Sequence, residues 1–181
     1  LLDTNQLLQQ AKGKTEILEG AAQQIVKLLK RETVIYDVKD GKLEHPLRRV
    51  PQGEEDITIE DEACEEQAAA WALENNRHAG TGTDHFKQAK RQYLAIRVNS
   101  TVYGVVGIMI QKQPLDAFEN SVLLSILGEC ALALENDKNV REKEEAAILA
   151  KNEQLRANLL RTISHDLRTP LTSISGNANN L

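Results

Sequence analysis

The sequence predicts an α+β fold, in which an antiparallel sheet is flanked by helices and followed by one long C-terminal helix. Two observations lead to this prediction. Segments rich in β-forming residues occur in pairs around short turns, in residues 32–50 and 92–111, which indicates two β-hairpins. Helical periodicity precedes the first pair, separates the two pairs and continues from about Asp116 almost to the end. Hairpins that alternate with helices are typical of an α+β domain.

The first element is predicted to be a helix within residues 5–30, because apolar residues recur there at spacings of three and four. A hairpin follows, with strands over residues 32–38 and about 43–50. The dipeptide Asp40-Gly41 between them favours a tight turn.

The second half of the domain repeats this order. A helix is expected over residues 59–75, because alanine and leucine return there, and a long loop over residues 76–90. Two further strands are predicted over residues 92–98 and 102–111, with a tight turn at Asn99.

The C-terminal helix changes character along its length. Residues 135–154 are mostly charged, which is typical of a solvated helix face. Beyond them the apolar residues form an a/d seam, namely Leu160, Ile163, Leu167, Leu171, Ile174, Ala178 and Leu181. A helix this polar is weakly stable without a partner. We therefore expect a homodimer, in which the seam forms a coiled coil or part of a four-helix bundle.

Composition narrows the class of protein. The 181 residues carry a net charge of −5, and no basic stripe with interleaved aromatics is present, so nucleic acid is not expected as a partner. The longest apolar run, residues 121–134, is interrupted by Gly128 and Glu129 and falls short of the ~20 residues of a membrane span. The piece is therefore expected to be soluble. Both ends are expected to be cuts in a longer protein.

One cluster of residues on the C-terminal helix suggests chemistry. His165 lies off the apolar seam and is followed at once by Asp166, which can accept a hydrogen bond from the imidazole and fix its tautomer. Thr169 shares the helix face of His165. Pro170 lacks the N–H for the bond to the Asp166 carbonyl and should loosen the helix there. A lone surface histidine is the ordinary alternative, but these neighbours favour a nucleophile.

The segment Ser164-His165-Asp166-Leu167-Arg168-Thr169-Pro170-Leu171 resembles the H-box of the HisKA class of sensor histidine kinases. The resemblance implies that His165 is the phosphoacceptor, that Asp166 is its acid/base partner and that Thr169 positions water for the phosphatase reaction. Arg168 would contact phosphate or the ATP domain. Residues 155–181 would be the first helix of the dimerisation domain.

The same resemblance implies partners that lie outside this chain. ATP and Mg²⁺ would bind to a domain of the full-length protein that the chain lacks, so the fragment alone is expected to be inactive. A response regulator would receive the phosphoryl group on an aspartate.

A second motif is the loop Ala79-Gly80-Thr81-Gly82-Thr83-Asp84, which follows a helix bearing Trp71. The arrangement resembles the GAF domain of KdpD-type potassium and osmotic sensor kinases. It implies a GAF-like sensory domain over residues 1–134 and a signalling-helix linker over residues 135–154. The chain would then be the cytoplasmic portion of a bacterial inner-membrane protein.

The loop itself offers little chemistry. Its Gly-x-Gly does not follow a predicted strand, so a phosphate-binding loop is not indicated. His78 and His85 flank it, and with Asp84 a metal pair is conceivable, but an ordinary pair of loop residues is favoured and no metal is predicted.

Two other functions remain open from the sequence. The chain could be a ligand-binding module for a small molecule or cyclic nucleotide that acts mainly as a dimeric scaffold, with its ligand unknown. It could also be a structural coiled coil, although Pro170 and the off-seam His165 argue against that.

Overall fold

The computed structural model describes residues 2–54, 57–111 and 113–179, and the side chains among them between Gln6 and Thr169. The chain divides into two compact units between Asp137 and Lys138.

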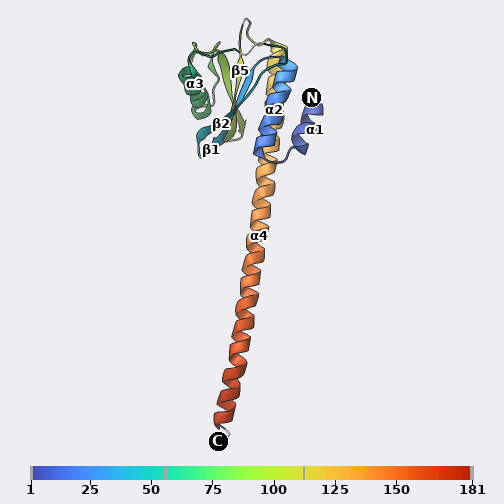
Figure 1. Cartoon of the computed structure of the whole chain (residues 1–181), viewed down its shortest axis with the longest axis vertical. Helices are drawn as coiled ribbons and strands as arrows, with labels where there is room; N and C mark the ends of the chain where they lie inside the picture. The colour runs from blue at the N-terminus through green and yellow to red at the C-terminus, as the bar shows by residue number, and fades with distance from the viewer. Residues whose placement is uncertain (1, 55–56, 112, 180–181) are drawn as a thin grey trace. The chain divides into compact units, whose positions relative to one another are not determined.

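The first unit is built on a five-stranded antiparallel sheet, which confirms the predicted α+β class (Figure 1). The strand order is β2-β1-β5-β4-β3. The strands are β1 (Thr33–Lys39), β2 (Lys42–Arg49), β3 (Ala79–Gly80), β4 (Arg91–Val98) and β5 (Thr101–Met109). One face of the sheet is covered by α2 (Lys14–Leu29) and the first part of α4 (Ala117–Asn179), and the other by α3 (Glu62–Asn75).

The two faces of the sheet bury separate apolar clusters, because successive strand residues point to opposite faces. In β1, Ile35 packs with α2 and α4, whereas Val34 and Tyr36 pack with α3. The fully buried α3 residues of this second cluster are small, namely Ala68, Ala69 and Ala72.

The predicted helix over residues 5–30 is wrong in one respect, because the structure contains two helices there. The first, α1, spans Leu2–Gln10, and α2 begins at Lys14. Gly13 between them has φ +86°, a left-handed conformation that glycine adopts without steric cost. The Glu16 carboxylate accepts a hydrogen bond from the Lys12 N–H at 2.7 Å and stabilises the break.

The expected loop over residues 76–90 also contains a short edge strand, β3. Its Gly80 has φ +98°, and a Cβ at this position would lie 2.0 Å from the carbonyl oxygen of Arg91. Only glycine permits this approach to β4. Because β3 pairs only with Gln92 and Tyr93, it leaves the rest of β4 as an unpaired sheet edge among the described strands.

The long helix α4 begins with a reciprocal cap. Asp116 Oδ1 accepts from the Glu119 N–H at 2.7 Å, and Glu119 Oε1 accepts from the Asp116 N–H at 3.3 Å. The helix continues through Pro170 to Asn179, so the proline does not end it. The predicted loosening at Pro170 stays a prediction, and its side chain and the seam from Leu171 onward lie outside the described side chains.

Contrary to the expectation from the sequence, one stretch of α4 within Ala117–Thr169 is long and apolar enough to cross a membrane. The difference arises because a span tolerates a glycine and a glutamate such as Gly128 and Glu129. This is weak support for a span, since Leu123, Ile126 and Leu134 of the same helix are buried in the core of the first unit.

Candidate functional site

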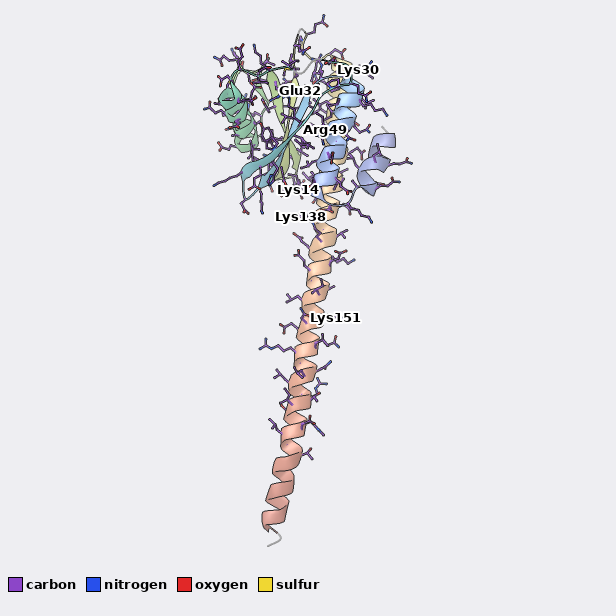
Figure 2. The ribbon with its side chains drawn as sticks, viewed as in Figure 1. Lys14, Lys30, Glu32, Arg49, Lys138 and Lys151 are labelled. Atoms are coloured by element: carbon purple, nitrogen blue, oxygen red, sulfur yellow. The ribbon has the colours of Figure 1, made fainter. Side chains whose placement is uncertain are left out.

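The predicted phosphoacceptor residues lie on the second unit, in the part of α4 that follows Lys138. Every described side chain from Lys138 to Thr169 is exposed, and side chains project from the helix throughout this length (Figure 2). The apolar residues of the predicted seam, Leu160, Ile163 and Leu167, are therefore about half exposed. A single helix of this kind is marginally stable in water, so these residues need a partner surface.

His165 is available for chemistry, because 81% of its side chain is exposed. Its Nδ1 lies 3.8 Å from Asp166 Oδ1, which is too long for a hydrogen bond. The separation follows from helix geometry, since consecutive residues point in different directions. The predicted His165–Asp166 hydrogen bond is thus not formed in this structure.

Thr169 lies one helical turn from His165, as the spacing predicts. Its hydroxyl donates a hydrogen bond to the His165 carbonyl oxygen at 3.2 Å. The hydroxyl is therefore bound to its own helix and would have to rotate to orient a water molecule. Arg168 is exposed on the same helix. The roles assigned to His165, Asp166, Arg168 and Thr169 stay predictions.

The residues around the glycine loop do not form a metal centre. No group of three or more His, Cys, Asp or Glu in the described part of the chain is placed to hold an ion. His85 instead stacks on Trp71, with ring centroids 4.0 Å apart and an angle of 23° between the planes. The His78 side chain is exposed, and partial desolvation lowers its pKa. Thr83 caps the loop, since its hydroxyl is 2.8 Å from each of the Gly80 and His85 carbonyl oxygens.

Sequence reasoning missed a buried network of charged residues that joins three elements of the first unit. Arg91 Nε donates to Glu32 Oε1 at 2.5 Å, and the Tyr93 hydroxyl donates to Glu65 Oε1 at 3.1 Å. Glu65, on α3, also accepts the N–H of Lys90 and of Arg91. The sequence did contain a signal for this network, because a charged residue stands beside the start of two apolar strands: Glu32 just before β1 and Arg91 at the start of β4.

The ionisation of this network follows from its partners. Burial disfavours the charged guanidinium of Arg91, but its hydrogen bonds with Glu32 and Tyr93 outweigh that effect and raise its pKa. Burial raises the pKa of Tyr93, so its hydroxyl stays protonated and can donate to Glu65. The network is therefore a fixed set of donors and acceptors that ties α3 to β4.

Comparisons with known proteins give a separate match for each of the two units. Residues 155–181 match the family model described as the His Kinase A (phospho-acceptor) domain, HisKA. The first unit is similar in fold to the crystal structure of the GAF domain of the potassium sensor histidine kinase KdpD from Escherichia coli. The TM-score is 0.61 at 21% identity, over 78% of this chain and 95% of that one. The cyanobacteriochrome TePixJ GAF domain has a TM-score of 0.53 at 15% identity, over 72% and 94%.

The first unit therefore has the fold of a GAF domain, and the last residues of the chain match the phosphoacceptor domain of histidine kinases. In sequence, the chain is similar to one segment of the KdpD sensor proteins. It is 32% identical to Sensor protein KdpD of Clostridium acetobutylicum over 174 residues, which are 94% of this chain and 19% of that protein. Sensor protein KdpD of Escherichia coli is 33% identical over 150 residues, 82% of this chain and 16% of that protein. The chain thus spans less than a fifth of these relatives.

Proposed function

We propose that this chain is the regulatory and phosphoacceptor segment of a two-component sensor histidine kinase. In this proposal the GAF domain controls autophosphorylation of His165, which then passes the phosphoryl group to an aspartate of a response regulator. The HisKA match over residues 155–181 is the observation that carries the proposal. The high exposure of His165 supports it, because two different partners must reach the imidazole in turn.

The main contribution of this chain to the phosphoryl-transfer reaction is an exposed nucleophile. An imidazole nitrogen of His165 attacks the γ-phosphorus of ATP, the bond from that phosphorus to the ADP oxygen breaks, and the ring gives up a proton. Asp166 takes the role of acid/base partner when its carboxylate turns toward the ring. Positioning and charge neutralisation of the phosphates, which dominate phosphoryl transfer, come from an ATP- and Mg²⁺-binding domain elsewhere in the protein. The fragment alone would then be inactive.

The dimer belongs to the same proposal. The half-exposed residues Leu160, Ile163 and Leu167 would pack against a second copy of the chain. We further propose that the full-length protein is a bacterial inner-membrane sensor whose cytoplasmic portion includes this chain, and that it acts in potassium or osmotic signalling. Support comes from the relatives, of which one is described as a potassium sensor.

Labelling in trans tests the phosphoacceptor. The 181-residue chain is incubated with a separately produced HisKA-type ATP-binding domain and γ-labelled ATP. Wild type should acquire acid-labile label, and His165→Gln should acquire none.

His45→Gln is a closely matched control. The His45 side chain is 85% exposed, and its Nε2 lies 3.8 Å from Oε2 of the adjacent Glu44, so it shares exposure and an acidic neighbour with His165. It should label like wild type. Equal labelling of the His165→Gln and wild-type chains would contradict the proposal.

A ligand-binding module that acts as a dimeric scaffold is the second candidate. A groove of about 400 Å³ between the β1–β2 hairpin and α3 favours it, with Tyr36 and Leu43 on one side and Ala70 and Leu73 on the other. Calorimetry with a panel of cyclic and linear nucleotides tests this function. Binding without any labelling of His165 would favour the scaffold, whereas labelling without binding would favour the kinase segment.

A further inference from the structure

A small cavity lies beside the free edge of β4, on the opposite side of the sheet domain from the β1–β2 hairpin groove. Its volume is about 230 Å³. It is open to solvent, and three parts of the first unit line it, namely the segment after α3, the strand β4 and the helix α4. The lining residues are Asn76, Arg77, His78, Leu94, Ala95, Ile96, Arg97, Leu124, Leu127 and Gly128.

The charge of this cavity differs from that of the chain as a whole. The chain carries −5, yet Arg77 and Arg97 line the cavity, His78 lies beside them, and none of its lining residues in the described part of the chain is acidic. Arg77 and Arg97 therefore bring positive charge to the cavity, and no carboxylate among its described lining residues offsets it. An anion in the cavity would offset that charge.

Arg97 gives a second, independent observation. Its Nε is buried and has no hydrogen-bond partner among the described residues. A buried donor without an acceptor is costly, and more so when it belongs to a charged group. By contrast, the other strand arginine of β4, Arg91, donates from Nε to Glu32 and from Nη1 to the Tyr93 hydroxyl. Arg97 is therefore a charged donor that lacks an acceptor beside an open cavity.

We propose that this cavity binds a phosphate-type oxyanion, either inorganic phosphate or the phosphoryl group of a small ligand, between Arg77 and Arg97. The planar guanidinium groups suit tetrahedral oxyanions, which they hold by paired hydrogen bonds. Asn76 supplies a further polar side chain at the rim, and Leu124 and Leu127 form an apolar wall. This binding proposal is independent of the phosphorylation of His165.

The site would also place a ligand against α4. Leu124, Leu127 and Gly128 are on the part of α4 that packs in the first unit. Gly128 opens the cavity on this side, because a Cβ built there meets no atom within 4 Å. An occupied cavity would thus contact the helix that continues to the HisKA segment.

Titration of the 181-residue chain with inorganic phosphate tests the proposal. Binding is measured by calorimetry and by amide NMR shifts, at constant ionic strength maintained with chloride. We expect saturable binding with shifts at Arg77, Arg97 and Gly128. Arg97→Met keeps the length of the side chain without its charge and should weaken binding about ten- to a hundredfold. The matched control Arg156→Met removes an exposed arginine of α4 and should leave the affinity unchanged.

A second variant separates loss of the site from loss of the fold. Gly128→Leu fills the cavity, leaves all charges in place and raises helix propensity, so the chain should stay folded while phosphate binding is lost. Circular dichroism checks the fold of each variant.

AMP and ATP distinguish the possible sources of the anion. If they bind as phosphate does, the site recognises the phosphoryl group alone, and tighter binding would indicate a nucleotide site; either result supports an oxyanion site provided Arg97→Met weakens it. No saturable binding of any of the three, or binding that Arg97→Met and Gly128→Leu leave unchanged, would overturn the proposal.

Discussion

Replacement of Arg91 by methionine tests how much the buried network contributes to stability. The Arg91 side chain is 4% exposed and that of Glu32 is 2% exposed, with 2.5 Å between Nε and Oε1. Loss of one partner from a buried ion pair typically costs ~3–5 kcal/mol, because the other charge stays buried. Glu32 keeps Arg48, whose guanidinium lies 2.7 Å from Oε2. We therefore expect the lower end of that range, about 3 kcal/mol.

The assay is urea unfolding followed by fluorescence of Trp71, the single tryptophan, which lies on α3 inside the first unit. In thermal unfolding, the same loss of 3 kcal/mol would correspond to a fall in Tm of roughly 10 °C for a domain of this size. Arg49→Met is the control. The Arg49–Glu19 pair has a similar distance, 2.6 Å, but its side chains are 34% and 40% exposed. Its loss should cost about 0–1 kcal/mol.

Two outcomes would refute this reasoning. If Arg91→Met and Arg49→Met destabilise equally, burial does not set the cost of breaking the pair. If the double variant Glu32→Gln/Arg91→Met is no more stable than Arg91→Met, the cost does not come from a buried carboxylate that has lost a partner. We expect the double variant to be the more stable of these two, because the 35% exposed Arg48 offsets the buried carboxylate only in part and neutral glutamine removes the remaining charge.

Three further outcomes follow from the first unit. Gly107→Ala should lower the free energy of unfolding by about 1–3 kcal/mol in urea titrations, because its Cβ would lie 2.5 Å from the Tyr93 ring. Alkylation at mildly alkaline pH should modify Cys64 well before Cys130, since Cys130 is fully buried and burial raises its pKa to about 12; mass spectrometry gives the order. Desolvation lowers the pKa of His78 below 6.5, so the contribution of this residue to stability is present above about pH 6.5 and is lost as the pH falls through the lowered pKa. In phosphate-free urea titrations, His78→Gln should therefore reduce the fall in the free energy of unfolding over this pH range.

The sequence predicts most of the fold because its signals are local. The strand boundaries in the structure lie within one or two residues of those expected, since each hairpin has its own turn residues. One miss is local, because Gly13 divides the first helix through its positive φ. The other depends on a tertiary contact, because Gly80 is held in an edge strand by close approach to Arg91, which lies eleven residues away in sequence.

The same contrast applies to functional residues. His165, Asp166 and Thr169 occupy one turn of a single helix, so their spacing is visible in the sequence. The cavity beside β4 is not visible there, because it brings together Arg77, Arg97 and Gly128 from three separate elements. Its defining feature is the Nε of Arg97, which has no hydrogen-bond partner among the described residues and is buried only once the chain is folded.

The packing of α4 in the first unit limits what any ligand of this domain can do. From Leu123 to Leu134 the helix has buried residues in the α2-facing core, and Leu124, Leu127 and Gly128 also line the oxyanion cavity. A ligand there can shift α4 between two packing states only by the difference in its affinity for them. A hundredfold difference in affinity supplies about 2.7 kcal/mol. Breaking the contacts of Leu123 alone would cost about 2–5 kcal/mol. Release of the helix would also expose Ile126, Cys130 and Leu134, which are buried in the same core, so its total cost is several times larger. A single small ligand can therefore bias α4 toward a rearranged packing but cannot release it from the core, so a regulatory change in this domain has to be a shift of a packed helix.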